Sequence, residues 1–217
     1  CPGCGSCSGM FTANTMACLC EALGLALPGN GTTPAVSSRR VALARQAGVQ
    51  VMTMLEKNIR ARDIMSPQAF ENAFITDMAM GGSTNSVLHL LAIAHEAGID
   101  VPLPQLNEYS QRTPHLVKLS PAGPQHIEDL YYSGGIGAVM RELQTMGKLN
   151  EDVITSTGLT LAENLEPGSP WAPDYATVDR NVLRSGDDPY SETGGLTILF
   201  GNLAPEGAVV KSAAVAP

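Results

Sequence analysis

The chain has 217 residues, of which 44% are hydrophobic and 16% charged, a composition typical of a folded globular protein rather than a disordered one. Its formal net charge of −8 argues against a nucleic acid or an anionic membrane surface as partner, because both recruit clustered lysine and arginine. No apolar run reaches the roughly 18 residues that a membrane span needs, and no signal peptide is visible.

The chain opens with a cysteine-rich segment. A disulfide framework would spread cysteines along the chain, whereas an odd number gathered at one end favours a reduced, cytoplasmic compartment. The first three have the spacing C-x2-C-x2-C, and the glycines between them allow tight turns, so their thiolates can converge on one soft metal centre. All five cysteines fall within the first twenty residues: Cys1, Cys4, Cys7, Cys18 and Cys20.

The spacing leaves three interpretations of these cysteines open. A ferredoxin run requires a fourth cysteine where this chain has Phe11, and a zinc ribbon requires a second pair downstream of Cys20, which is absent. An iron–sulfur cluster could take one or more thiolates, with the other ligands supplied from outside the chain. The cysteines could instead be small buried hydrophobes, or one could be a catalytic nucleophile. Cys18 and Cys20 lie in a helical pattern, and we expect them in the core.

Two helices are predicted after the cysteine segment. Apolar residues from Ala13 to Gly24 recur at helical spacing, which predicts a helix that starts just after Cys7 and ends at Pro28-Gly29. Its N-terminus would point at the cysteine loop and favour a thiolate or an anionic cluster. A second helix follows Pro34. Its apolar stripe comprises Val41, Ala44, Gly48, Val51, Met52, Leu55 and Ile59, and its solvated side comprises Arg39, Arg40, Arg45, Lys57, Arg60 and Arg62.

A glycine-rich turn separates the next two helices. Ser66-Pro67 is an N-cap followed by proline, and it predicts a helix through about Met80. Another helix follows the turn and ends at Gly98. The turn places backbone N–H groups and the side chains of Ser83, Thr84 and Asn85 at a helix N-terminus, where a carboxylate or phosphate can bind. An ordinary capped helix start, with Ser83 or Thr84 as the cap, is the alternative.

The second half of the chain mixes helix and strand signals. Residues 115–119 and 153–157 are predicted as short strands, with a helix over 136–146 between them. This alternation predicts an α/β fold that is rich in helix and has a small parallel sheet. A segment rich in proline, aspartate, glycine and serine at 164–192 indicates a long connection or domain boundary. Residues 196–200 and 208–215 are then predicted as the first strands of a β-rich domain.

Several long motifs carry a family resemblance. They are CPGCGSCSGMFTANTM at the start, EALGLALPG after it, MGGSTN followed by LHLLAIA, TGLTLAEN, GGLTILFGNLAP and GAVVK. In this order they resemble the dihydroxy-acid and phosphogluconate dehydratase family, over essentially the whole chain. PGCGSC and LPGNG favour the dihydroxy-acid branch over the branches that act on sugar acids.

The resemblance implies an activity and a cofactor. The reaction would remove water from 2,3-dihydroxy-3-methyl carboxylates and give 2-oxo acids in valine and isoleucine biosynthesis. Family members carry an iron–sulfur cluster on three cysteines from three separate segments, and the position matching the last of these ligands is Cys7. Cys1 and Cys4 match no family-wide ligand position. The resemblance does not distinguish a [2Fe–2S] from a [4Fe–4S] cluster.

The resemblance also implies that much of the enzyme lies outside this chain. The family's Mg²⁺ ligands and modified lysine would precede Cys1, and the serine base would follow Pro217, so we expect no catalytic residue here and an inactive isolated chain. Residues 1–190 would be the second half of an N-terminal, cluster-binding α/β domain, and residues 191–217 the start of a truncated C-terminal β domain. Ser83, Thr84 and Asn85 are the expected lining of the substrate pocket.

Further expectations and two alternatives accompany this interpretation. The full-length protein would be a homodimer that acts on a small molecule. An aldonate or 6-phosphogluconate dehydratase would have the same chemistry on another substrate. A non-catalytic domain, with its cysteines as a structural metal site or as core, is the alternative of a different class.

Overall fold

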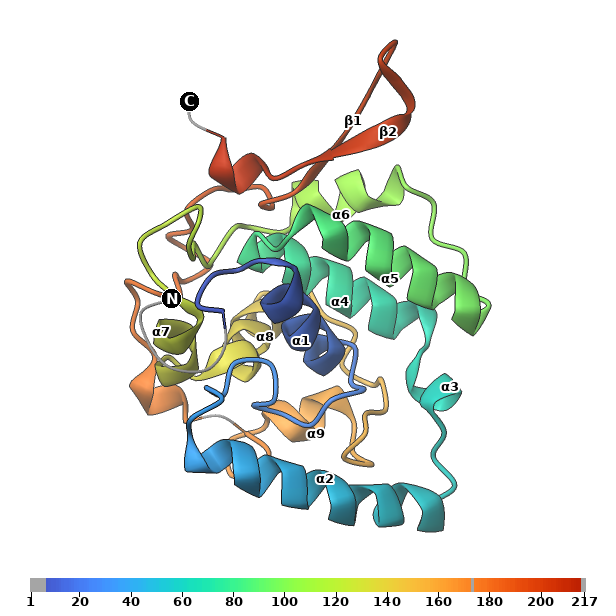
Figure 1. Ribbon diagram of the computed structural model, residues 1–217, viewed down its shortest axis with the longest axis vertical. Helices are drawn as coiled ribbons and strands as arrows, with labels where there is room; N and C mark the ends of the chain where they lie inside the picture. The colour runs from blue at the N-terminus through green and yellow to red at the C-terminus, as the bar shows by residue number, and fades with distance from the viewer. Residues whose placement is uncertain (1–6, 173, 216–217) are drawn as a thin grey trace.

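The computed structural model describes residues 7–172 and 174–215, so Cys1 and Cys4 lie outside the described residues. The described part is mainly helical, with one hairpin near its C-terminal end (Figure 1). Its elements are α1 (Thr12–Ala22), α2 (Ser38–Glu56), α3 (Ala61–Ile64), α4 (Pro67–Met80), α5 (Thr84–Ala97), α6 (Gln105–Arg112), α7 (Ile127–Tyr132), α8 (Gly135–Thr145), α9 (Leu161–Leu165), the 3₁₀ turns η1 (Tyr175–Thr177) and η2 (Ser212–Ala214), and the strands β1 (Thr197–Gly201) and β2 (Ala204–Val210).

Helix α4 forms the centre of the core. It is buried from Ala69 to Met80, apart from a partly exposed Glu71, and it contacts α1, α5, α6 and α8. The predicted bounds are confirmed: the Ser66 side chain accepts a hydrogen bond from Ala69 N, and Gly81 ends the helix in the left-handed conformation with φ +56°. A helix that is covered on all sides can be apolar around its whole circumference, as α4 nearly is.

Helix α1 is shorter than the sequence predicts. The prediction ended it at Pro28-Gly29, whereas the helix ends at Ala22. Gly24 has φ +85°, a left-handed conformation that breaks the helix, and the following residues fold back so that Leu25 N and Ala26 N both donate to Cys20 O. The early end leaves residues 25–33 free to form the loop that packs beside α1.

The sheet is antiparallel, and the predicted small parallel sheet is wrong. In the described residues the only sheet is the hairpin β1–β2, in which Thr197 pairs with Val210 and Gly201 with Ala204. Strands joined by a two-residue connection can pair only in antiparallel orientation. The hairpin is anchored to α6 by Asn107, whose side chain exchanges two 2.8 Å hydrogen bonds with the backbone of Ile198. The second strand ends five residues earlier than the predicted 208–215.

The two short strands predicted before the hairpin are isolated bridges. His115 and Val117 bridge antiparallel to Ser191 and Leu183, and Leu119 makes one parallel bridge to Gln125. Strand pairing does not extend because helix α4 takes the backbone donors of this segment: Leu116 N and Val117 N both donate to the carbonyl oxygen of Ala79. The segment 153–157 folds back on itself in a turn, with one antiparallel bridge from Ile154 to Thr160.

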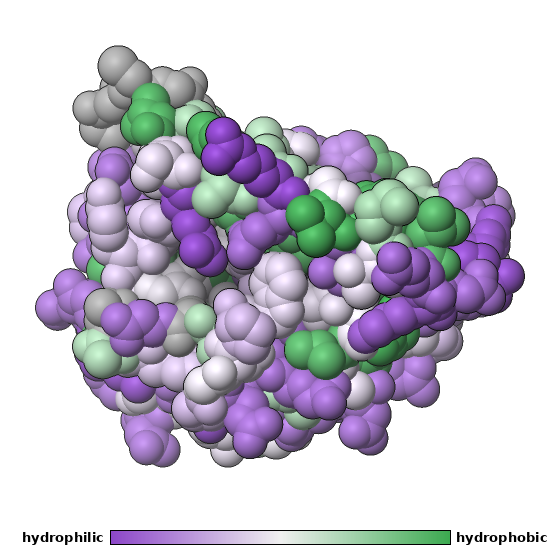
Figure 2. Space-filling view, turned by 90° about the horizontal axis from the view of Figure 1, so that it is seen from below, coloured by the Kyte–Doolittle hydropathy of each residue, from purple (hydrophilic) through white to green (hydrophobic). Residues whose placement is uncertain are grey.

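Helix α2 lies apart from this core, along the bottom of Figure 1. Its N-cap is Ser37, and of its residues only Leu43 is buried. Figure 2, seen from that side, shows apolar residues on this face between strongly hydrophilic ones. The predicted stripe exists but is exposed: its large members on the helix are Val41, Val51, Met52 and Leu55, with Leu55 72% exposed.

No helix among the described residues is long and apolar enough to cross a membrane.

Candidate functional site

The loop that carries Cys7 is held in place by hydrogen bonds from three directions. Asn14, in the first turn of α1, donates from Nδ2 to the carbonyl oxygens of Cys7 at 2.8 Å and Gly9 at 2.7 Å. Met10 N donates to Ser120 O at 2.7 Å, and Ile127 N donates to Ser8 O at 2.8 Å. Cys7 is a free, half-buried cysteine, so its thiol is presented from a fixed backbone.

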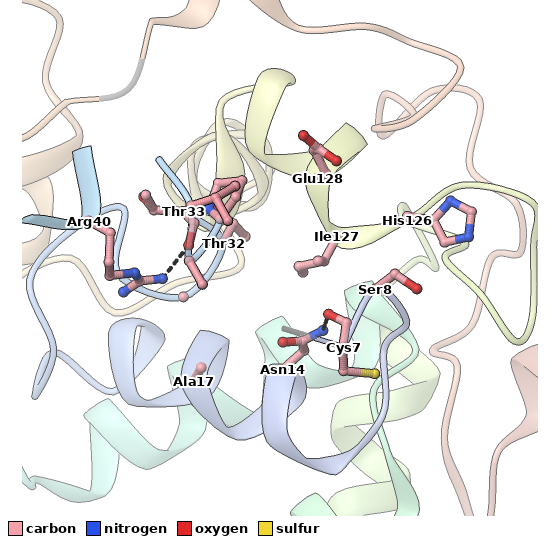
Figure 3. A pocket seen from close by; sticks show the side chains of 14 residues that line it. Cys7, Ser8, Asn14, Ala17, Thr32, Thr33, Arg40, His126, Ile127 and Glu128 are labelled. Atoms are coloured by element: carbon pink, nitrogen blue, oxygen red, sulfur yellow. Dashed lines mark hydrogen bonds between the residues drawn. The ribbon is translucent and has the colours of Figure 1, made fainter. Parts of the chain in front are cut away.

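Cys7 opens onto a cavity of about 330 Å³ (Figure 3). One wall comes from the Cys7 loop and α1, the opposite wall from the loop before α2, and the third from the start of α7. The polar side chains that line it are Cys7, Ser8, Asn14, Thr32, Thr33, Arg40, His126 and Glu128. The cavity therefore offers a thiol, hydroxyls, an amide and charged groups of both signs.

A buried carboxyl group shapes the second wall. Glu21 of α1 accepts hydrogen bonds from Gly29 N at 2.9 Å and Gly31 N at 2.8 Å. Burial raises the pKa of Glu21 to about 7, although these two hydrogen bonds and the nearby Arg40 act to lower it. Gly31 lies so close to α1 that a Cβ there would be 2.8 Å from Cys18 Cα, which explains the second glycine in LPGNG.

Arg40 belongs to this wall and not to the solvated side of α2, where the sequence placed it. Its guanidinium donates to Asn30 Oδ1 at 2.8 Å, to Asn30 O at 3.0 Å, and to the Thr33 carbonyl oxygen. The other residues of that predicted set on α2, Arg39 and Arg45, are exposed as expected. The planar guanidinium with its five N–H donors suits Arg40 to close a loop through several carbonyl groups at once.

Ser83, Thr84 and Asn85 lie at the N-terminus of α5, outside the lining of the Cys7 cavity. Ser83 Oγ caps α5 by accepting from Asn85 N at 3.2 Å, as in the alternative interpretation of this turn as an ordinary capped helix start. Asn85 Nδ2 donates to Thr12 Oγ1 at 2.7 Å, and Thr12 Oγ1 lies 3.3 Å from Ser83 Oγ. The structure thus joins these polar groups to the first turn of α1, the same turn that supports the Cys7 loop.

The described residues supply one free thiol at this cavity and not a complete ligand set for a metal. Cys18 is fully buried, and burial raises the pKa of its thiol well above the usual value, as expected for a core cysteine. Cys20 is only partly buried, so its predicted place in the core holds in part. Within residues 7–172 and 174–215, no three His, Cys, Asp or Glu side chains are grouped to hold a metal ion. Among the described residues, Cys7 is the one cysteine that lines this cavity.

Several cavity residues were not singled out from the sequence. Asn14, Thr32, Thr33, His126 and Glu128 meet at the cavity from segments far apart in the chain. Asn14 and the loop before Thr32 do lie within or beside two of the long motifs, which is the signal that could have drawn attention to them. His126 and Glu128 lie in no such motif, and only the folded chain brings them to Cys7.

A cavity that brings together a free cysteine and several polar side chains has the chemistry to bind a small molecule or a soft metal. Comparison with protein families is more specific. Residues 1–164 match the model described as dihydroxy-acid/6-phosphogluconate dehydratase N-terminal, and residues 181–217 match the corresponding C-terminal model. The chain belongs to this family.

Similar proteins support the same assignment. All 217 residues align at 58% identity with proteins named dihydroxy-acid dehydratase from Caldanaerobacter subterraneus subsp. tengcongensis and Moorella thermoacetica. A protein of the same name from Oleidesulfovibrio alaskensis is 57% identical over the same length. The chain spans 38% of the length of each of these relatives.

Proposed function

We propose that this chain is part of a dihydroxy-acid dehydratase, a hydro-lyase that removes water from 2,3-dihydroxy-3-methyl carboxylates and gives the 2-oxo acids of valine and isoleucine biosynthesis. The observation that carries the proposal is the identity of 56–58% to proteins of that name over every residue of the chain. The N-terminal family model matches the first part of the chain and the C-terminal model the last part.

Cys7 is the proposed ligand of an iron–sulfur cluster, of either the [2Fe–2S] or the [4Fe–4S] type, with the remaining ligands on other segments of the longer protein. Its support is local: Cys7 is a free, half-buried cysteine that lines the cavity, and its backbone is held by Asn14. A cluster with only three protein thiolates leaves one iron able to act as a Lewis acid towards a departing hydroxyl group.

The chain's own residues would bind and orient around that centre. Asn14 holds the backbone carbonyl of Cys7 and thereby the position from which its side chain extends. Ser83, Thr84 and Asn85 are proposed to line the substrate pocket, as hydroxyl and amide groups that can bind a carboxylate or a hydroxyl group of the substrate. We place the proton-abstracting base and the Mg²⁺ site on the remainder of the longer protein.

The cluster assignment is tested by Cys7→Ser in the full-length protein that contains this chain. Serine keeps the size of the side chain but lacks the soft thiolate that iron prefers, so we expect iron and sulfide content to fall to a small fraction of the parent value. Cys20→Ser is the matched control, because Cys20 lies on the same helix–loop unit away from the cavity. Undiminished iron and sulfide in Cys7→Ser would remove Cys7 from the ligand set.

The proposal that the base and the Mg²⁺ site lie outside this chain is tested with the 217-residue chain itself. Because only one cluster ligand and no proposed base lie in it, we expect no turnover of 2,3-dihydroxy-3-methylbutanoate, whereas the full-length protein should convert it. Product 2-oxo acid is measured after reaction with phenylhydrazine. Turnover by the isolated chain would contradict the placement of the base and the Mg²⁺ site elsewhere.

The organisation of the longer protein is also a proposal. We propose an N-terminal, cluster-binding domain up to residue 190 and a C-terminal β domain from residue 191, supported by the hairpin that begins at Thr197. The match to the C-terminal family model begins ten residues earlier, at residue 181. A cytoplasmic homodimer is proposed, and the free thiols of Cys7, Cys18 and Cys20 support a reducing compartment.

A further inference from the structure

A buried aspartate lies directly beneath the Gly81-Gly82 turn. Asp77, in the last turn of α4, has no exposed surface. Its Oδ2 lies 2.5 Å from Ser86 Oγ, while its Oδ1 has no hydrogen-bond partner among the residues that the structure describes. A buried carboxylate with one unpaired oxygen is among the most costly arrangements in a protein interior, so this group requires an explanation.

The hydroxyl of Ser86 indicates where a proton lies. Ser86 Oγ is 2.5 Å from Asp77 Oδ2 and also 2.5 Å from the carbonyl oxygen of Ser83. Ser86 has one hydroxyl proton, and the Ser83 carbonyl can only accept. If Asp77 were ionised, one of these two short contacts would join two acceptors without a proton. If Asp77 carries a proton on Oδ2, it donates to Ser86, Ser86 donates to Ser83, and each contact has one donor.

The other oxygen of Asp77 is accommodated by a glycine. A Cβ on Gly82 would overlap Asp77 Oδ1, so only glycine leaves room for this oxygen. In the protonated acid, Oδ1 is a neutral carbonyl oxygen, and a neutral acceptor costs less to leave unpaired than half of a carboxylate. The number of protons available at Ser86 and the unpaired Oδ1 therefore both favour the protonated form of Asp77.

In the part of the chain that the structure describes, no positively charged group pairs with Asp77. Lys211, at the start of η2, lowers the pKa of Asp77 by its charge, but its Nζ donates to Met10 O at 3.4 Å, and no ion pair within the described residues includes Asp77. Cys18 of α1 is close enough to Asp77 for the two groups to interact electrostatically, but a thiol carries no positive charge. His115, on the far side of Gly81, is buried, and burial lowers its pKa, so it brings no positive charge near pH 7. Burial is the first cause of a raised pKa at Asp77.

We propose that Asp77 is a positioning residue that keeps its proton in the folded chain near neutral pH and uses it to hold the Gly82-Ser83 turn through Ser86. The turn is thereby fixed from behind, and Thr15 Oγ1 fixes it from the side by accepting from Ser83 N at 3.1 Å. Ser83 then presents its own hydroxyl at the start of α5. The link from this turn to substrate binding rests on the proposed function, whereas the location of the proton does not.

The proton is tested by carbon NMR of this chain labelled with ¹³C at the aspartate carboxyl groups. Asp77→Asn assigns the Asp77 resonance by removing it, and Asp63→Asn assigns as reference an exposed aspartate whose pKa is lowered by its hydrogen bond with Arg60. At pH 6 we expect the chemical shift of a carboxylic acid at Asp77 and of a carboxylate at Asp63. A carboxylate shift at Asp77 would overturn the proposal. If Asp77→Asn does not fold, the infrared spectrum of Glu21→Gln decides, because Glu21 is a second buried acid with a raised pKa, and the absence of a carboxylic-acid C=O stretch in that variant at pH 6 overturns the proposal equally.

The positioning role is tested in the active full-length protein by comparing Asp77→Asn with Asp77→Ala. The amide of asparagine donates to Ser86 as the acid does, so we expect a KM within about threefold of the parent, whereas loss of one buried hydrogen bond in the alanine variant should raise it about tenfold. Equal KM values for the two variants would overturn this role. An inactive parent would count against the proposed function instead, while the carboxyl resonance of Asp77 would still report the proton.

Discussion

Helices α4 and α2 are both long and apolar enough to be recognised from sequence, yet they have opposite environments. From Ala69 to Met80, α4 has one residue that is not buried, Glu71, whereas α2 buries Leu43 alone. The large apolar residues of α2 that stay exposed include Val41, Val49, Val51, Met52 and Leu55. Helical periodicity thus indicates the secondary structure of a segment and which residues share a face, but the neighbours of that face depend on distant parts of the chain.

The difference also indicates where the stability of the chain comes from. Burial of apolar surface and close packing are the main favourable terms in folding, so α4 should contribute most of the core energy and α2 very little. Substitutions in the two helices should therefore differ strongly even when the same number of side-chain atoms is removed. The predictions below go from the largest expected effect to the smallest.

Phe74→Ala should give the largest loss. Phe74 is fully buried in α4 and its ring stacks on Tyr109 of α6, with ring centroids 6.1 Å apart. Removing the ring loses its transfer free energy and leaves a cavity, so the free energy of unfolding should fall by about 3–5 kcal/mol. Urea denaturation followed by circular dichroism measures it. A loss below about 1 kcal/mol would show that α4 is not the packed centre of this chain.

The buried part of the chain also contains titratable groups, so we predict that the free energy of unfolding depends on pH. Burial raises the pKa values of Asp77 and Glu21 to about 7 and lowers that of His115 to about 4. Between about pH 5 and 6.5 the folded chain therefore holds two carboxyl protons that the unfolded chain has released, and the unfolded chain holds one histidine proton more. The net excess is one proton in the folded state, so the free energy of unfolding should fall by about 1.4 kcal/mol per pH unit as pH rises.

Glu21→Gln isolates one of these carboxyl groups. It leaves Asp77 and His115 to oppose each other, so the slope between about pH 5 and 6.5 should approach zero. The matched control is Glu56→Gln on α2, where the side chain is exposed in the folded chain and the slope should stay unchanged. Urea titrations at several pH values give the slopes. An unchanged slope in Glu21→Gln would contradict the raised pKa of Glu21.

The sequence predicts an element of the fold well when the residues that determine its ends lie close to it in the chain. The start of α4 is predicted to the residue and its end closely, because Ser66, Pro67 and Gly81 are signals that act within one helical turn. The parallel sheet was wrong because strand pairing depends on distant partners, and the segment at 115–119 finds its partners in Ala79 of α4 and in Ser191. The end of α1 was missed because a single glycine, Gly24, breaks it before the proline signal is reached.

The same distinction between local and distant signals applies to the residues of the candidate site. Cys7 stands in a motif long enough to be specific, and the cap at Ser83 is again a local signal. Arg40 was placed in solvent because an arginine on a helix usually lies there, yet the loop at Asn30 and Thr33 folds back and binds its guanidinium. Such a contact depends on the turn that Glu21 holds, and no periodicity in the sequence encodes it.

The smallest effect is expected on the exposed face of α2. Leu55 is 72% exposed, so Leu55→Ala removes little buried surface and should change the free energy of unfolding of this chain by no more than about 0.5 kcal/mol. Leu43→Ala on the same helix is the control, and because Leu43 is 4% exposed it should cost about 2–3 kcal/mol. Both are measured by urea denaturation. If Leu55→Ala costs as much as Leu43→Ala, the stripe on α2 is packed in solution and the contrast with α4 fails. Repeating the pair in the full-length protein sharpens the contrast, because a cost at Leu55 that appears only there would locate a surface of the longer protein that covers α2.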